Sequence, residues 1–458
     1  MTLPDSIPAG SGPERAVVIE PAGSSWASLA RGFTRPASSN AFRAELGLPA
    51  DGLVVMSGHQ VEFWHAGIFA KRAACAAAAA KLGGSAGWLA VDQDSSEPAV
   101  IRYPARRDGR LVAAAWEIGP QLGNRADVPP ACRPTADPRR LRDLPTDAAT
   151  PGVSDGLARV AGALASASGE STLASQVIAA TDSLLAGVVR PMPTVLATSI
   201  SRTGLFGEVL TTMRADPGRC VDLYNRAVEA FPGSRLRPLD ATRGELPLWH
   251  LREGLPRRRV LASMLGSIPA SELAPRALLM TGMIRHAGCD LFIHGTGGAA
   301  YDPAGERWLA AWLGWSLAPA VVASATLSIP IEGVRVVSAS EAGRARWAAH
   351  HARHDPGLLG DEWAARRKAA LLGEIREATT RGLDPREHYD EMHRLLSRVR
   401  LEHAQRLREL EERAARASAD AAQSIVASDR TWPFPLHDPR ALGSLADSVS
   451  ASLASGGW

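Results

Sequence analysis

Short apolar runs alternate with longer helical segments in the first part of the chain, and this alternation predicts a parallel α/β sheet. A buried strand is expected at residues 53–57 (LVVMS) and a second at 88–92 (WLAVD). Residues 66–82 are expected as a helix, because Gly83 and Gly84 follow them and glycine commonly stands just past a helix C-terminus. Strand, loop, helix and strand together occupy about forty residues, which is the length of a βαβ crossover.

The same alternation returns later in the chain. Residues 271–286 are expected as a helix, and residues 289–294 (CDLFIH) as the strand that follows it. A further helix is expected at 304–313, with the Asp-Pro pair before it as cap and first turn. The run VVASATLSI at 321–329 is rich in β-branched residues, which suits a buried strand. The expected fold class is therefore α/β, with a Rossmann-like parallel sheet core and helical insertions.

The composition changes to Arg, Glu, Ala and Leu between residues 361 and 427, where Pro385 separates two expected helices. In the second helix, one stripe of positions recurs at spacings of three and four, which is typical of a coiled coil. The stripe consists of Met392, Leu396, Val399, His403, Leu407, Leu410, Ala414, Ala417 and Ala421. Packing on the protein's own body and a homodimer through the C-terminal helices both remain open.

These patterns divide the chain into four parts. An N-terminal extension rich in Pro, Gly and Ser is expected at 1–50, followed by the Rossmann-like α/β core at 51–345. Within that core, residues 104–190 are expected as a peripheral insertion with short helices. A helical coiled-coil-like arm is expected at 346–428, and a C-terminal tail that packs on the core at 429–458.

Composition narrows the class of protein. The 458 residues carry a net charge of only +3, which gives no electrostatic footprint for nucleic acid. No apolar segment reaches the roughly 20 residues that span a bilayer, and no signal-peptide pattern opens the sequence. The four cysteines lie far apart without a CxxC pair, which disfavours a zinc knuckle and a disulfide framework. We therefore expect a cytoplasmic protein with a small-molecule substrate and with neither nucleic acid nor membrane as a partner.

Polar residues follow the first predicted strand, at the edge where open parallel sheets bind ligands. Gly58, His59 and Gln60 form this loop, and His65 precedes the helix. Glycine permits a close backbone approach, and a histidine beside a helix N-terminus can hold a phosphate or transfer protons. In the alternative interpretation, each histidine bonds only to its own loop. Lys71, on the helix, is a candidate to neutralise an anion.

Two further strand ends carry candidate residues. Asp92 and Asp94 follow the second strand and could hold an amine, a ribose or Mg²⁺, although a turn or cap cluster would use the same residues. The segment after residue 293 is rich in glycine, which lets a backbone approach a phosphate or carboxylate, unless it is a plain turn. Its candidate residues are His294, Gly295, Gly297, Gly298, Tyr301 and Asp302. Arg285 is a second candidate to neutralise an anion.

A metal site is chemically conceivable but is not predicted. Imidazoles and carboxylates such as those of His59, His65, Asp92, Asp94 and His294 are zinc or iron ligands. None of them has the HxH or HExxH spacing of a preformed site. The cofactor stays open, with a nucleotide and Mg²⁺ as the candidate.

The stretch SGHQVEFWHAGIFAKRAACAAAAAKLGG and the later WLAVDQD resemble the core motif of BshC, the family that adds cysteine in bacillithiol synthesis. Gly58, Gln60, Phe63, Gly67 and Lys71 fall where that family has its glycine, glutamine, aromatic, glycine and helix lysine. The sequence also resembles a bacterial group with a GHQ loop, a VD-x-D strand end and an FIHG-x-GG segment. The resemblance implies a Rossmann-like core with a nucleotide site, a C-terminal coiled coil that forms a dimer, and a reaction that joins cysteine to a glucosamine-malate amine.

The function expected from the sequence is thus that of a BshC-like ligase, which joins cysteine or another amino acid to a small amine or amino sugar. His59, His65, Asp92 and Asp94 are the expected catalytic residues, and the other candidates bind substrate or nucleotide. A nucleotidyltransferase or hydrolase that uses the same loop is the first alternative. A non-catalytic dimeric binding protein is the second.

Overall fold

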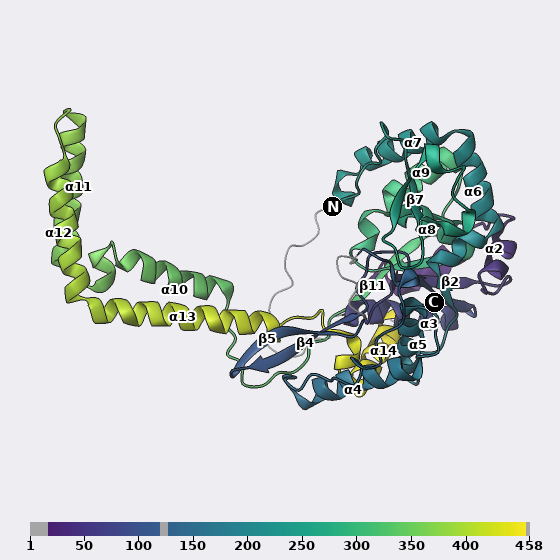
Figure 1. The fold of residues 1–458 in the computed structure, drawn as a ribbon, viewed down its shortest axis with the longest axis horizontal. Coiled ribbons are helices and arrows are strands. Elements are labelled where there is room, and N and C mark those ends of the chain that lie inside the picture. Colours follow the sequence, from purple (N-terminus) through teal and green to yellow (C-terminus); the bar gives the residue numbers. More distant parts are fainter. Residues whose placement is uncertain (1–16, 120–126, 455–458) are drawn as a thin grey trace. The chain divides into compact units, whose positions relative to one another are not determined.

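The central element is a mostly parallel sheet within a mixed α/β fold (Figure 1). The computed structural model describes residues 17–119 and 127–454. The sheet has the order β1-β11-β10-β2-β3-β6, and only β1 runs antiparallel to its neighbour β11. Its strands are β1 (Val17–Glu20), β2 (Val54–Gln60), β3 (Ser85–Val91), β6 (Thr194–Leu196), β10 (Leu291–His294) and β11 (Ala320–Ala325).

Helix α3 (Ala66–Leu82) connects β2 to β3 and has the bounds that the sequence predicts. Parallel strands need such a crossover, because a tight turn cannot return the chain to the same end of the sheet. The helix begins after His65, whose side chain caps the Gly67 amide, and it ends at Gly83 in the left-handed region with a φ of 67°. Because β2 and β3 pair from Val54–Ser85 through Gln60–Val91, the two strands end side by side.

The segment predicted as a helix over 271–286 begins instead as strand β9 (Leu273–Pro275). Pro275 disfavours helical backbone in the residue before it, and the helix α8 (Ala277–Met283) starts only after it. The helix then widens into a π-helical turn at Ile284–Gly288. Strand β9 joins β7 (Glu245–His250) and β8 (Arg258–Leu261) in a separate antiparallel sheet of order β8-β7-β9.

The stretch predicted as an insertion with short helices begins with a β-hairpin. Strands β4 (Val100–Arg107) and β5 (Arg110–Glu117) are joined by Asp108 and Gly109, whose φ values are 50° and 73°. Two positive φ angles make the type I′ turn for which Asp-Gly is a strong hairpin signal. Helices α4 (Pro151–Ser166) and α5 (Leu173–Leu185) follow later in the stretch.

The chain forms two compact units. The described part of the first contains residues 17–103, 114–119, 127–329 and 430–454, and the second contains 104–113 and 330–429. The sequence predicts an N-terminal extension, but its described part belongs to the first unit as strand β1 and helices α1 (Trp26–Gly32) and α2 (Ser39–Glu45). A buried ion pair of 2.9 Å between Arg43 and Asp290 ties α2 to the start of β10.

Other helices of the first unit include α6 (Gly204–Ala215), α7 (Pro217–Ala230), α9 (Asp302–Leu313) and α14 (Pro439–Ala454). The segment before α14 packs on this unit, where the Phe434 amide donates a hydrogen bond of 2.5 Å to the Trp64 carbonyl. Residues 1–16, 120–126 and 455–458 of the predicted extension, insertion and tail lie outside the described residues. Within the described ranges, no helix combines the length and apolar composition needed to cross a lipid bilayer.

The second unit consists mainly of four helices: α10 (Ala339–Ala352), α11 (Glu362–Thr380), α12 (Arg386–Glu402) and α13 (Ala404–Ala427). Helix α10 packs on α13, and α11 packs on α12. The single helix that the stripe predicts is interrupted at His403, whose Nε2 lies 3.3 Å from a carboxylate oxygen of Asp361. Part of the stripe is buried within this unit: Val399 clusters with Leu371, and Ala421 clusters with Val337.

Candidate functional site

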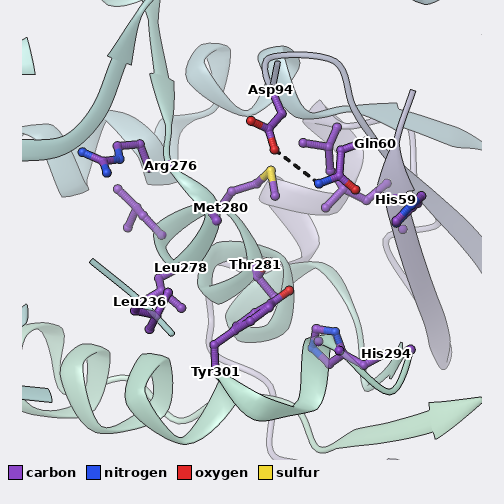
Figure 2. Close-up of a pocket in the computed structure, with 18 of the residues that line it drawn as sticks. His59, Gln60, Asp94, Leu236, Arg276, Leu278, Met280, Thr281, His294 and Tyr301 are labelled. Carbon is purple, nitrogen blue, oxygen red and sulfur yellow. Dashed lines mark hydrogen bonds between the residues drawn. The ribbon is translucent and has the colours of Figure 1, made fainter. Parts of the chain in front are cut away.

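A cavity of about 580 Å³ lies in the first unit, where the carboxyl ends of β2, β3 and β10 meet (Figure 2). Its other walls come from β7, from α8 and from the segment after α7. Most of the residues predicted from the sequence line it: Gly58, His59, Gln60, His65, Lys71, Asp94, His294, Gly295, Gly297, Gly298 and Tyr301. Asp92, Arg285 and Asp302 lie outside this lining.

Lys71 is a buried amine at the floor of the cavity. Its side chain is 4% exposed, and its Nζ donates a hydrogen bond of 2.6 Å to the Gly58 carbonyl. The face of Trp88 lies 5.8 Å away, and no carboxylate pairs with Lys71 among the described residues. Burial lowers the pKa of Lys71 to about 7, because the charged ammonium loses its hydration without gaining a counter-ion.

The two histidines of the first loop both line the cavity. His65 Nδ1 accepts a hydrogen bond of 3.0 Å from the Gly67 amide, so the neutral ring carries its proton on Nε2. His59 Nε2 lies 3.2 Å from a carboxylate oxygen of Glu62. Burial lowers the pKa of each ring, and the positive charge of Lys71 adds to this effect. The lowered pKa keeps each ring neutral even at a pH where an ordinary histidine is partly protonated.

The two aspartates after β3 point to different places. Asp94 lines the cavity, where it accepts a hydrogen bond of 3.3 Å from Gln60 Nε2 and pairs with Arg257. Burial raises its pKa, but the charge of Arg257 and the hydrogen bonds to the carboxylate outweigh burial, so the net pKa is lowered. Asp94 is thus a fixed negative charge in the wall.

Asp92 is buried and does not line the cavity, whereas the sequence predicts that it holds substrate beside Asp94. Its two oxygens accept hydrogen bonds from the Thr198 amide at 2.9 Å and the Thr198 hydroxyl at 2.5 Å. Burial raises the pKa of Asp92 to about 6. These contacts fix the turn at Ala197–Arg202 to the end of β3.

The glycine-rich segment after β10 holds His294 in one orientation. His294 Nε2 lies 2.9 Å from Asp302 Oδ2, and its ring is nearly perpendicular to the ring of Tyr301. A Cβ atom on Gly298 would lie only 2.5 Å from His294 Nδ1, so glycine is required for the ring to sit there. Burial raises the pKa of Tyr301 to about 12, so the phenol stays protonated.

Arg285 contacts Asp302 and does not line the cavity, whereas the sequence predicts that it neutralises an anion there. Its Nη1 lies 3.3 Å from Asp302 Oδ1, and its Nη2 donates to Glu306 at 2.5 Å. Its Nε donates to the Ala318 carbonyl at 2.8 Å. With every branch of the guanidinium in use and only 2% of the residue exposed, Arg285 positions Asp302.

The wall of the cavity opposite the histidines is not predicted by the sequence. Trp249 of β7 lies there, with the guanidinium carbons of Arg257 and Arg276 at 4.2 and 4.6 Å from its ring centroid. Arg235 and Arg237 line the same wall. The Arg-rich link before and after ELPLWHL was the only available signal, and no regular spacing connected its arginines to one another.

The cysteines and the metal-ligating side chains add no further site. All four cysteines are buried free thiols, and burial raises the pKa of Cys75 to about 12, which keeps it from acting as a nucleophile. In the ranges that the structure describes, no three His, Cys, Asp or Glu side chains are grouped to hold a metal ion.

Neither comparison with known proteins identifies a relative. No protein-family model matches the chain, and the search of curated proteins returns no match.

Proposed function

We propose that this chain is a BshC-like enzyme, a ligase or transferase that joins cysteine or another amino acid to a small amine such as an amino sugar. The observation that carries the proposal is the position of Lys71, a buried amine without a carboxylate partner among the described residues, in the cavity at the carboxyl edge of the sheet. Lysines whose pKa is lowered by burial serve as bases near neutral pH. Perturbed titratable groups in a cleft mark candidate active sites.

The cavity offers a role for each group around Lys71. The neutral amine of Lys71 accepts a proton from the incoming ammonium and so generates the nucleophile. His65, with its proton on Nε2, donates to the oxygen that leaves the carboxyl carbon. The new bond is an amide, and the atoms lost in the condensation amount to one water. His294, held against Asp302, is a second group that can transfer a proton.

The proposal includes a Rossmann-like sheet, a cytoplasmic location and a homodimer. The parallel order β10-β2-β3, the crossover helix α3 and a glycine-rich loop after β10 support the first. Four free cysteines suit a reducing compartment. For the dimer, nine of the ten large hydrophobic residues that the described part of the chain exposes belong to the second unit, as expected of a surface that another chain covers.

A ligation assay tests this function directly. Wild-type protein is incubated with cysteine and glucosamine-malate, with and without ATP and Mg²⁺, and mass spectrometry follows a product equal to the two substrates minus one water. Thermal shift against each component runs in parallel, since a ligand at about 100 times its Kd stabilises by roughly 2.7 kcal/mol. Product from wild type and none from Lys71→Met supports the proposal. Equal product from both variants, or no product with any amino acid and amino sugar, contradicts it.

A nucleotidyltransferase or hydrolase is the second candidate, favoured by the arginines that line the cavity. Guanidinium groups are the usual partners of phosphate oxygens. Incubation with ATP or CTP alone separates the two candidates: release of phosphate or pyrophosphate without an amino-acid acceptor favours this one. Binding without turnover of any compound would favour a non-catalytic dimeric binding protein.

A further inference from the structure

The wall of the cavity opposite the histidines carries an excess of positive charge. Four arginines line it: Arg235, Arg237, Arg257 and Arg276, called here the arginine wall. Figure 2 shows Arg276 across the cavity from His59 and His294, with Met280 and Thr281 between them. These arginines come from the segment after α7 and from the loops that border the β8-β7-β9 sheet.

The carboxylates at this wall are too few for its guanidinium groups. Arg257 pairs with Asp94. Glu245, which is 1% exposed, is shared by three arginines: Arg276 at 2.7 Å, Arg237 at 3.1 Å and Arg259 at 3.5 Å. The four arginines of the wall therefore meet only two carboxylates, one of which also pairs with Arg259 outside the cavity lining. This leaves an excess of positive charge at the cavity, which an anionic ligand would neutralise.

Trp249 lies under two of these arginines, which already use some of their donors. Arg257 donates from Nη1 to Asp94 and from Nη2 to the Ser95 hydroxyl, and Arg276 donates from Nη1 to Glu245. Arg257 and Arg276 both lie over its ring, at 4.2 and 4.6 Å from the centroid. The ring holds the two guanidinium groups by cation–π attraction, which takes up none of their N–H donors. The Arg276 nitrogens other than Nη1 remain to donate to a phosphate or carboxylate.

Arg235 is the arginine of the wall whose guanidinium has no partner among the described residues. Its backbone has a φ of 56°, in the left-handed region that a residue with a side chain rarely adopts. Arg235 is exposed at the cavity, and it makes no hydrogen bond or ion pair with any residue of ranges 17–119 and 127–454. Its backbone ends the short helical turn Pro232–Ser234, and its guanidinium is left free to meet a ligand.

We propose that the arginine wall binds the anionic end of the substrate, a phosphate or carboxylate group, while the reacting end of the same molecule lies at Lys71 and the histidines. This assignment of the substrate class rests on the proposed function, because it takes the cavity to be the active site. The two ends of the cavity then have different tasks. The wall, whose charge is permanent, holds the substrate, and Lys71 and the histidines carry out proton transfer.

Binding of small anions to the purified full chain tests the proposal without any need for turnover. Inorganic pyrophosphate and L-malate are titrated by calorimetry into wild type, Arg235→Ala and Arg235→Ala/Arg237→Ala. Arg258→Ala is the matched control, since it removes the same charge from β8 outside the cavity lining. Each charge-assisted bond lost should weaken binding roughly tenfold. We therefore expect Kd to rise about tenfold in the single variant and about a hundredfold in the double variant, with little change in the control.

The outcomes separate this inference from the proposed function. Tighter binding of pyrophosphate indicates a phosphorylated substrate, and tighter binding of L-malate indicates a carboxylate; either result supports the wall. Failure of wild type to bind both probes overturns the inference, as does equal weakening in Arg235→Ala and Arg258→Ala. If anions bind as expected but no ligation product forms, the arginine wall is an anion site and the proposed ligase function is rejected. If product forms and KM is equal in Arg235→Ala and Arg258→Ala, the proposed function is supported but the anion-binding role of the arginine wall is rejected.

Discussion

The Lys71 ammonium nitrogen and the Gly58 carbonyl oxygen are 2.6 Å apart, and this bond links the helix α3 to the end of the strand that precedes it. Gly58 itself allows β2 and β3 to approach, because a Cβ at this position would lie 2.5 Å from the Leu89 carbonyl oxygen. One short βαβ unit thus supplies both the lysine and the acceptor that orients it. The carbonyl satisfies one N–H of Lys71 and leaves the amine otherwise without a partner among the described residues.

Replacing Lys71 by methionine should remove activity and increase stability. The pKa of Lys71 is about 7 in the folded protein and about 10.4 in an unfolded chain. The unfolded state therefore binds more protons between pH 7 and pH 10, and the free energy of unfolding of wild type rises with pH across this window. Since each pKa unit corresponds to about 1.4 kcal/mol, Lys71→Met should gain several kcal/mol at pH 7 and little at pH 10.

Urea denaturation of both proteins at these two pH values measures the difference, and initial rates give the loss of activity, about a hundredfold or more for a general base. Wild-type activity should rise with pH through about 7 as Lys71 loses its proton. Lys71→Arg keeps a permanent charge and should be as inactive as Lys71→Met. An arginine variant with wild-type rates would exclude a role for the neutral amine.

Asp92→Asn should leave the enzyme active and make it more stable at neutral pH. The pKa of Asp92 is raised to about 6 by burial, so the folded state loses stability as pH rises from about 4 to 6. Asparagine has no such loss and can still accept the hydrogen bond from the Thr198 amide. We expect a gain of about 2 kcal/mol at pH 7, measured by chemical denaturation. Asp92→Ala, which leaves the Thr198 donors unsatisfied, should lose about 2 kcal/mol. If the Asp92→Asn variant folds normally but is inactive, Asp92 is a catalytic residue after all.

The histidine side of the cavity could be predicted from the sequence because it depends on local order. Strand β2, its polar end and helix α3 are contiguous, and the rule that parallel strands end at one edge brings His59 and Asp94 together. The direction of a side chain after a strand ends is not fixed by that rule. Asp92 and Asp94 are two residues apart, yet Thr198 holds the first and Arg257 the second.

The arginine wall could not be predicted in this way, since its residues meet only through tertiary pairing. Antiparallel pairing of β7 with β9 places Trp249 opposite Ala274 and so brings Arg276 near Trp249. Arg257 reaches the same ring from the chain before β8. The hairpin of β4 and β5 is a different case, because Asp108 and Gly109 between two extended segments are a local signal in the sequence for such a turn.

Gly298→Ala should impair catalysis with little effect on folding. The added Cβ would lie 2.5 Å from His294 Nδ1, so the ring must move away from its place beside Asp302. A displacement of about 1 Å in a catalytic group can cost a hundredfold in rate. Gly297→Ala is the matched control, because its Cβ would meet nothing within 4 Å. Steady-state kinetics and thermal denaturation of both variants measure the effect, and equal rates would show that the position of His294 does not matter.

The second unit offers a test of self-association. Leu401 on α12 and Ile425 on α13 are 79% and 68% exposed. Exposure of such large apolar side chains to water is unfavourable and suggests a surface that another chain covers. If the C-terminal helices form the proposed homodimer, the partner covers such residues and a charge there opposes association. We expect wild type to sediment as a dimer in analytical ultracentrifugation and Leu401→Glu/Ile425→Glu to shift toward the monomer, with an unchanged helical signal in circular dichroism. Leu144→Glu changes an exposed leucine of the first unit and should stay dimeric. A monomeric wild type, or dissociation in all variants alike, would remove the helices as the interface.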